Sequence, residues 1–323
     1  MNIPLRVAVL ENIHTIGIDL CRQFSVVDVL TQLSRQKLLN IIKHYDAIII
    51  KSVTCVDHEL LRHAPKLKAV GRAGVGVDNI DLSALEQQGI TLITTPGENA
   101  VSAAEFTVCL ILHLCKRMSE VVINMSQRDF RRHLLEGREL STMIVGLVGL
   151  GNVGMAVATR LSTFGCQIMG YSKIVKSPQE FLRIGKLVNS LEELIAAVDI
   201  LSFHVPLTAE TKHMLNANTL AHTTRPILVV NTARGAVIDD QALLDAINAG
   251  RVKAAALDVL TPELPYDEKS RASSYTHPLL QHDKIFVTPH LASSTEEAQV
   301  RIATQIAQQL RAVLLYREVT IEN

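Results

Sequence analysis

A glycine-rich hexapeptide set between an apolar run and a helical pattern constrains this chain most. Residues 149–154 read Gly-Leu-Gly-Asn-Val-Gly, directly follow the apolar run Ile144 to Val148, and precede helical spacing through Val157 and Leu161. In a strand–turn–helix context the pattern G-x-G-x-x-G is typical of dinucleotide-binding units, whereas a bare match is weak evidence. A glycine turn without a ligand is the alternative. The context favours a βα unit that binds a dinucleotide.

Each glycine of this turn has a physical role in such a unit. Gly149 permits the tight turn, Gly151 lets the backbone approach a pyrophosphate, and Gly154 lets helix and strand pack closely. The first N–H groups of the helix, at Asn152 and Val153, then face the anion. We expect all five residues to contact the cofactor.

Strand and helix patterns alternate along two parts of the chain. Short β-branched runs end at Ile50, Arg72 and Thr95, and after Pro96 the rhythm restarts with runs such as MIVGLVG and PILVVN. This alternation predicts parallel sheets in an α/β fold. A chain of 323 residues is long enough for two domains. We expect a hinge near Pro96 and a core-facing helix over Ser294 to Tyr316.

Composition excludes several classes of function. Lys+Arg 32 against Asp+Glu 32 gives no net charge, so the basic footprint of a nucleic-acid or anionic-membrane binder is missing. The five scattered cysteines lack metal-ligand spacing, which predicts reduced thiols and no metal site. The N-terminus lacks a secretory signal pattern. The uncharged stretch Leu140 to Thr159 contains four glycines, which indicates a strand, turn and helix start rather than a membrane span. We expect a cytoplasmic protein without nucleic-acid or membrane partners.

The residue after the next strand bears on the choice of dinucleotide. That strand, Gln167 to Tyr171, should be followed by Asp or Glu if NAD is the ligand. The chain instead has Ser172 and Lys173, with Lys176 close by. A neutral to positive position tolerates a ribose 2′-phosphate, although lysines in a turn are equally well explained by solvation. We expect Ser172 and Lys173 to contact the cofactor, and either NAD or NADP to serve.

Three polar residues follow later strands of the second series. Arg234 follows Ile227–Asn231, Glu263 comes after Ala254–Asp258, and His290 follows a strand that ends near Val287. Because ligands bind beyond the carboxyl ends of parallel strands, we expect the three to face one crevice. Arg234 can present a planar fork to a carboxylate. Glu263 would stabilise the protonated imidazole of His290 and fix its tautomer. Loop charges and a capping histidine are the alternative interpretation.

Five segments closely resemble the D-isomer-specific 2-hydroxyacid dehydrogenase family, particularly its phosphoglycerate dehydrogenase branch. They are GRAGVGVDNID, VGLVGLGNVG, NTARGAVIDDQALLDAI, AALDV followed by Glu263, and TPHLASST. The resemblance runs from about Asp46 onward and implies two Rossmann-like domains with parallel sheets. The implied substrate domain is discontinuous, residues 1–96 plus 292–323, around a dinucleotide-binding domain of residues 97–291. Dimerisation through the cofactor domain is also implied.

The resemblance assigns roles to single residues. Arg234, Glu263 and His290 match the family's catalytic arginine, glutamate and histidine, with His290 giving the proton to the substrate oxygen during reduction. Asp258 matches the residue that holds the nicotinamide carboxamide. The backbone of Val75 and Gly76 matches the loop that receives the substrate carboxylate. The other residues expected at the cofactor are Val205, Thr232, Ala233, Arg234 and His290.

The loop after the third strand bears on the substrate. It reads Lys51-Ser52-Val53-Thr54, where the phosphoglycerate enzymes carry Arg before Ser-x-Thr. A lysine meets phosphate as a point charge rather than a bidentate fork, and Arg72 is a second cation nearby. We therefore expect Lys51, Ser52 and Arg72 to bind 3-phosphoglycerate, in serine biosynthesis. Solvated surface cations are the alternative for both charges.

Two other functions stay open. Glyoxylate, hydroxypyruvate or another short 2-keto acid is the rival substrate, and an NAD(H)-sensing binding protein is the alternative from another class. Two departures from the family bear on the site. Phe130 stands where many members carry Trp, and the stretch Tyr266 to His277 is longer than expected.

Overall fold

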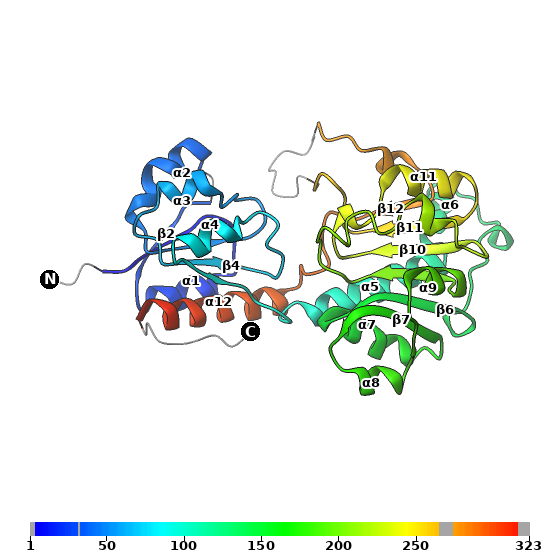
Figure 1. Ribbon diagram of the computed structural model, residues 1–323. Helices are drawn as coiled ribbons and strands as arrows, with labels where there is room; N and C mark the ends of the chain where they lie inside the picture. Colours follow the sequence, from blue (N-terminus) through cyan, green and yellow to red (C-terminus); the bar gives the residue numbers. More distant parts are fainter. Residues whose placement is uncertain (1–3, 32, 265–273, 316–323) are drawn as a thin grey trace. The chain divides into compact units, whose positions relative to one another are not determined.

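The computed structural model describes residues 4–31, 33–264 and 274–315. It divides into two compact units, Met1–Asn99 with Thr295–Asn323, and Ala100–Ser294 (Figure 1). The chain therefore leaves the first unit after Asn99 and re-enters it at Thr295. The boundaries expected from the sequence were 96/97 and 291/292.

The first unit is built on a parallel sheet with the strand order β2-β1-β3-β4-β5. Its strands are β1 (Arg6–Val9), β2 (Val26–Val29), β3 (Ala47–Ile50), β4 (Ala69–Arg72) and β5 (Thr91–Ile93). Its helices are α1 (Thr15–Arg22), α2 (Arg35–Ile41), α3 (His58–Arg62), α4 (Leu82–Gln87) and α12 (Glu296–Leu315), with a short 3-10 turn η1 (Ile42–His44).

Both faces of this sheet are buried. Helices α2, α3 and α4 cover one face, where Ile48 and Val70 lie, and α1 and α12 cover the other, where Val7 and Ile49 lie (Figure 1). Burial on both sides explains why the strands read as continuous apolar runs. The apolar stripe expected in the last helix faces this core through Ile302, Ile306 and Leu310.

The second unit is built on a larger parallel sheet with the order β12-β11-β10-β9-β6-β7-β8. Its strands are β6 (Ile144–Leu150), β7 (Gln167–Val175), β8 (Lys186–Leu187), β9 (Ile200–Phe203), β10 (Ile227–Asn231), β11 (Val252–Leu257) and β12 (Ile285–Val287). Its helices are α5 (Ala100–Cys115), α6 (Met118–Ser126), α7 (Asn152–Ser162), α8 (Pro178–Leu182), α9 (Leu191–Ala197), α10 (Ala217–Leu220) and α11 (Asp240–Asn248). The 3-10 turns are η2 (Arg132–Leu134), η3 (Leu140–Thr142), η4 (Gly235–Val237) and η5 (Pro278–Gln281).

This sheet is also covered on both faces. One core combines the sheet with α5, α7 and α8, and the other combines it with α9, α10 and α11. Residues 140–159, the uncharged stretch, fold as η3, β6, the glycine turn and most of α7. Within the described part of the chain, no helix has both the length and the apolar character needed to cross a membrane.

Strand order places the sequence motifs within each unit. The order reverses between β6 and β9 in the second unit and between β1 and β3 in the first. In open parallel sheets, ligands bind beyond the carboxyl ends of the strands at such a reversal. The expected α/β fold with two parallel sheets is confirmed, and each unit has its own reversal point.

Candidate active site

The turn between β6 and α7 can be formed only with glycine at two positions. Gly149 has φ +95°, and a side chain there would lie 2.8 Å from the carbonyl oxygen of His204. A Cβ on Gly154 would lie 2.0 Å from the carbonyl oxygen of Gly149. Beside Gly151, by contrast, no described atom lies within 4 Å of where a Cβ would be. The turn is thus tight on the protein side and open beside Gly151, as close approach of a dinucleotide requires.

Two residues after β9 lie against this turn. Val205 was expected at the cofactor, and its Cγ1 would be 2.9 Å from a Cβ on Gly149. His204 was not predicted, although its backbone and side chain lie beside both Gly149 and Gly154. Its Nε2 lies 3.0 Å from the Ser202 hydroxyl, and burial lowers the pKa of His204 to about 3. A neutral, half-buried histidine therefore supports the turn.

The strand expected to end at Tyr171 is longer in the structure. β7 continues to Val175 after a register shift opposite β6, so Ser172 lies within the strand. Its hydroxyl accepts a hydrogen bond from Leu150 N–H at 3.1 Å and donates to the Ile174 carbonyl. Ser172 therefore joins β7 to the start of the glycine turn.

The two lysines near Ser172 have protein partners. Lys173 forms an ion pair with Glu210, and Lys176 donates to the side chain of Asn152. Both members of the Lys173–Glu210 pair are largely exposed, so the pair is weak. Glu210, which the sequence analysis did not consider, places negative charge beside the position expected to receive a 2′-phosphate.

A buried asparagine holds the loop that carries Arg234. Asn231, at the end of β10, accepts a hydrogen bond from Ala233 N–H at 3.0 Å and donates to the carbonyl of Arg234 at 2.9 Å. Thr107 of α5 donates its hydroxyl proton to Ala103, so it accepts from Thr232 at 2.8 Å. Arg234 itself donates to the Ala233 carbonyl at 2.7 Å. The backbone before the guanidinium is therefore fixed from two sides.

Asp258 holds the loop that carries His290. Its carboxylate is fully buried and accepts hydrogen bonds from the Thr288 hydroxyl at 2.6 Å and from the N–H groups of Leu291 and Ala292 at 2.8 Å each. Burial raises the pKa of Asp258, and these hydrogen bonds oppose that rise. The Asp258 carbonyl also accepts from His290 N–H at 2.9 Å. Asp258, for which the sequence predicts a cofactor contact, therefore also holds the loop of His290.

His290 lies beside the carboxylate predicted for it. Its backbone is in the left-handed region at φ +56°, which costs energy for a residue with a side chain and persists because the surrounding contacts hold it. Its Nδ1 is 3.1 Å from Glu263 Oε2. Because a carboxylate only accepts hydrogen bonds, Nδ1 carries the proton, and Nε2 is the ring atom left to exchange one.

The three predicted loops meet at one edge of the sheet. A Cβ on Gly235, next to Arg234, would lie 2.2 Å from the carbonyl carbon of Leu260, so the loop of Arg234 packs directly on the segment that leads to Glu263. Of the long stretch Tyr266 to His277, residues 274–277 are described, and the rest lies outside the described residues. Within the described ranges, no group of three or more His, Cys, Asp or Glu side chains is placed to hold a metal ion.

The residues predicted to bind substrate lie in the first unit. Lys51 and Ser52 follow β3, and Arg72, Val75 and Gly76 lie at or after the end of the adjacent β4. Ile50 and Arg72 are paired in register, so the two loops begin side by side. Lys51 Nζ donates to Gln299 of α12 at 3.1 Å. The Arg72 guanidinium lies where a side chain on Gly74 would be, 1.6 Å from that Cβ position.

A buried glutamate that the sequence analysis missed holds the loop after β3. The carboxylate of Glu11 accepts hydrogen bonds from three successive N–H groups, those of Ser52 and Val53 at 3.1 Å and Thr54 at 2.8 Å. Asn79 donates to the carbonyls of Lys51 and Thr54. An acidic residue directly after an apolar strand was the available signal for Glu11.

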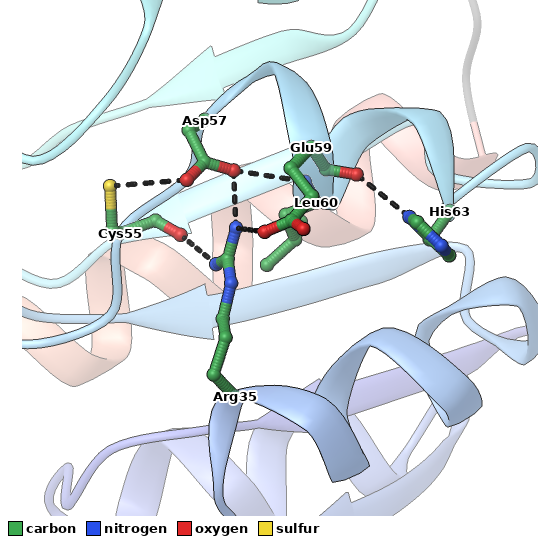
Figure 2. Close-up of polar contacts among 6 residues, drawn as sticks. All are labelled: Arg35, Cys55, Asp57, Glu59, Leu60 and His63. Carbon is green, nitrogen blue, oxygen red and sulfur yellow. Dashed lines mark hydrogen bonds and ion pairs between the residues drawn. The ribbon is translucent and has the colours of Figure 1, made fainter.

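The far end of the same loop is held by Arg35 of α2. Figure 2 shows its guanidinium between the Cys55 carbonyl, which accepts at 2.7 Å, and the carboxylates of Asp57 and Glu59. Asp57 in turn accepts from Leu60 N–H and begins α3. The backbone from Lys51 to Cys55 therefore has fixed partners along its length.

Comparison with known proteins agrees with this architecture. Residues 108–292 match the family model described as D-isomer specific 2-hydroxyacid dehydrogenase, NAD binding domain. A D-3-phosphoglycerate dehydrogenase of Methanocaldococcus jannaschii is 35% identical over 96% of this chain and 57% of its own. The TT0316 protein of Thermus thermophilus superposes with a TM-score of 0.84 at 31% identity, over 96% of this chain and 97% of its own.

A second solved structure has a similar fold. D-lactate dehydrogenase from Aquifex aeolicus, complexed with NAD and lactic acid, has a TM-score of 0.84 at 26% identity, over 96% of this chain and 95% of its own. The chain spans about half the length of the curated relatives that it matches. It belongs to the D-isomer-specific 2-hydroxyacid dehydrogenase family, as its motifs predicted.

Proposed function

We propose that this chain interconverts 3-phosphoglycerate and 3-phosphohydroxypyruvate with a nicotinamide cofactor. The observation that carries the dehydrogenase activity is the Glu263–His290 pair, which lies at the same sheet edge as the glycine turn and the loop of Arg234. Relatives named D-3-phosphoglycerate dehydrogenase, 35–38% identical to this chain, support the phosphorylated substrate.

The proposed roles rest on the family resemblance and are supported by the contact between Glu263 and His290. The bound cofactor supplies or accepts the hydride at the substrate carbon. In the direction of reduction, His290 Nε2 gives the carbonyl oxygen its proton, while Glu263 stabilises the charged imidazole before the transfer. Arg234 holds the substrate carboxylate. In total, the keto acid gains one hydride and one proton and becomes a hydroxy acid.

The cofactor fits the turn beside Gly151. We propose that the N–H groups at the start of α7, at Asn152 and Val153, bind the pyrophosphate, and that the described residues after β9 and β10 border the rest. NAD is the expected cofactor of the family domain. We also propose that NADP is accepted, because Ser172 replaces an acidic residue, although Glu210 beside Lys173 works against a 2′-phosphate.

The substrate phosphate is proposed to meet Lys51 and Arg72. These two cations lie at the paired ends of β3 and β4, so they can act on one anion. The backbone of Val75 and Gly76 and the hydroxyl of Ser52 complete the proposed substrate site. A short unphosphorylated acid is the second candidate, favoured by the likeness to D-lactate dehydrogenase.

We further propose a homodimer formed through the second unit. Exposed apolar side chains gather on and after α6, and they are Met118, Val122, Ile123, Met125, Phe130 and Leu134. So many large apolar side chains on one short segment are typical of an interface between protein chains. The five free thiols fit the reducing conditions of the cytoplasm, which we propose as the compartment.

A substrate panel tests the proposal. Absorbance at the NADH or NADPH band is followed while 3-phosphohydroxypyruvate, hydroxypyruvate, glyoxylate or pyruvate is added separately. We expect the highest kcat/KM with the phosphorylated acid. A preference for an unphosphorylated acid would contradict the substrate. Tight cofactor binding without turnover of any acid would contradict the enzyme and favour a dinucleotide-sensing protein.

A further inference from the structure

The segment that carries Glu263 lies outside regular secondary structure, yet it has to hold a carboxylate beside His290. Glu263 lies beyond the end of β11, and its side chain is 42% exposed. Exposed ion pairs are weak because flexible side chains lose entropy when they meet. A stable contact at 3.1 Å therefore depends on what fixes the backbone next to Glu263.

Tyr275 fixes the residue just before Glu263. Its hydroxyl donates to the Pro262 carbonyl at 2.7 Å, across thirteen positions of sequence. Burial, together with the carboxylates of Asp240 and Glu263, raises the pKa of Tyr275. The hydroxyl thus keeps the proton that it donates at neutral pH.

His277 fixes the residue before that. Its side chain is 5% exposed, and its Nδ1 accepts a hydrogen bond from Leu279 N–H at 3.2 Å. Nε2 therefore carries the proton, and it lies 3.2 Å both from the Thr261 carbonyl and from Asp240 Oδ2. The rings of Tyr275 and His277 are nearly parallel, with centroids 6.1 Å apart.

The loop of Arg234 also contacts the segment before Glu263. Gly235 contacts the backbone of Leu260 and the hydroxyl of Thr261 so closely that a Cβ would lie 2.2 Å and 2.6 Å from them. Residues 260–262 therefore have contacts both with this loop and with the side chains of Tyr275 and His277. The backbone next to Glu263 is therefore held by contacts from two separate parts of the fold.

We propose that Tyr275 and His277 are positioning residues that hold the carboxylate of Glu263 beside His290. This proposal depends on the proposed function in one respect only, which is the catalytic role given to the Glu263–His290 pair. Among the described residues, the charged groups that act on Tyr275 and His277 are Glu263 and Asp240. Asp239 and His213 in turn interact electrostatically with Asp240.

Two conservative variants remove the contacts one at a time. Tyr275→Phe deletes the hydroxyl and keeps the ring. His277→Asn keeps a side-chain acceptor for Leu279 N–H and loses the donor to Thr261. Each should lower kcat/KM for keto-acid reduction about two- to tenfold, the value of one hydrogen bond. The loss should appear in kcat, as it should in Glu263→Gln, while the dissociation constant for NADH stays at its wild-type value, because both variants act on the Glu263–His290 contact and leave the glycine turn intact.

An NMR measurement tests the proposal without turnover. The Nδ1–H signal of His290, which the contact with Glu263 should protect from exchange with water, is followed in the wild type, Tyr275→Phe, Glu263→Gln and the double variant. The expected result is faster exchange of this proton in Tyr275→Phe and no further change when Glu263→Gln is already present. An unchanged exchange rate in Tyr275→Phe, or an equal change in both backgrounds, would overturn the proposal.

Controls separate positioning from general stability. Tyr45→Phe removes a hydroxyl that donates to Asp28 at 3.0 Å in the first unit, so it should leave the exchange of the His290 Nδ1–H unchanged. If His277→Asn fails to fold, the single-oxygen change in Tyr275→Phe still decides the outcome. Failure of the proposed function shows up separately, as no turnover of any keto acid.

Discussion

The carboxylate of Asp258 accepts hydrogen bonds from three residues around His290. The amide of Asn231 holds the loop of Arg234 by accepting from Ala233 N–H and donating to the carbonyl of Arg234. Both side chains are buried at the ends of strands. Buried polar groups are costly unless they are hydrogen-bonded, so a satisfied one fixes the groups that satisfy it. The positions of the proposed catalytic side chains therefore come from their buried neighbours.

His204 should make stability depend on pH. Burial lowers the pKa of His204 to about 3 in the folded chain, whereas its pKa in the unfolded chain is about 6.5. At pH values between these two, only the unfolded chain takes up the proton. The contribution of His204 is fully present above about pH 6.5 and is lost as the pH falls toward 3, with a slope of about 1.4 kcal/mol per pH unit at most. Urea unfolding at pH 7 and pH 5 measures the loss.

Matched variants make this test specific. His204→Gln should flatten the pH dependence, whereas His222→Gln, which changes an exposed histidine in the same unit, should keep the wild-type slope. Equal slopes in His204→Gln and the wild type would show that His204 does not cause the dependence.

The strands and helices that carry the motifs could be predicted from local sequence patterns, but the side-chain contacts that hold them could not. The spacing of Gly149, Gly151 and Gly154 predicted a strand, a turn and a helix, because that conformation is encoded within six residues. By contrast, Glu11 accepts hydrogen bonds from residues that lie 41 to 43 positions further along the chain, and no sequence periodicity indicates such contacts. The predicted end of β7 at Tyr171 was wrong because pairing with β6 resumes at Val175, after a shift that the sequence does not mark.

Two glycine substitutions should separate folding from cofactor binding. Gly154→Ala places a Cβ 2.0 Å from a backbone oxygen, so it should lower the melting temperature and weaken NADH binding. Gly151→Ala meets no described atom within 4 Å, so the melting temperature should stay close to wild type while NADH binding weakens. Calorimetric titration and thermal melts measure both. Unchanged NADH affinity in Gly151→Ala would contradict the proposed pyrophosphate site.

The loop after β3 should depend on Glu11. In Glu11→Gln, one amide oxygen replaces a carboxylate that accepts three N–H groups, so unfolding free energy should fall by about 1–3 kcal/mol. The KM for the keto acid should rise, while the dissociation constant for NADH, whose proposed site is in the second unit, should not change.

Asp46→Asn is the matched control for Glu11→Gln. Asp46 accepts from Arg6 N–H at 3.0 Å just before β3, at the opposite end of that strand, so its loss should affect stability without raising the KM. A KM that rises equally in both variants would mean that general destabilisation, rather than the loop, is responsible.

At the scale of the whole molecule, the sequence predicted two α/β units because each has its own series of βα patterns, and family motifs occur in both. The prediction of a discontinuous first domain came from the resemblance, since nothing in the apolar stripe of α12 says which sheet it covers. Close packing decides which sheet α12 covers. An example is the contact between Gly17 of α1 and Ala303 of α12.

The exposed apolar segment around α6 should control assembly. Val122→Lys together with Met125→Lys places two charges among side chains that are 63% and 52% exposed, so the single chain should fold normally. Sedimentation velocity should then show a shift from dimer to monomer relative to the wild type. An unchanged sedimentation coefficient would place any dimer contact elsewhere.

Single-turnover and steady-state reduction by His290→Gln, compared with the wild type on the best substrate of the panel, tests the central claim most directly. We predict a loss of about 10²- to 10⁴-fold in kcat, the contribution of a positioned general acid, with NADH affinity within about twofold of wild type. A variant that keeps more than a tenth of the wild-type kcat would show that His290 is not the proton donor and that the proposed chemistry at this edge of the sheet is wrong.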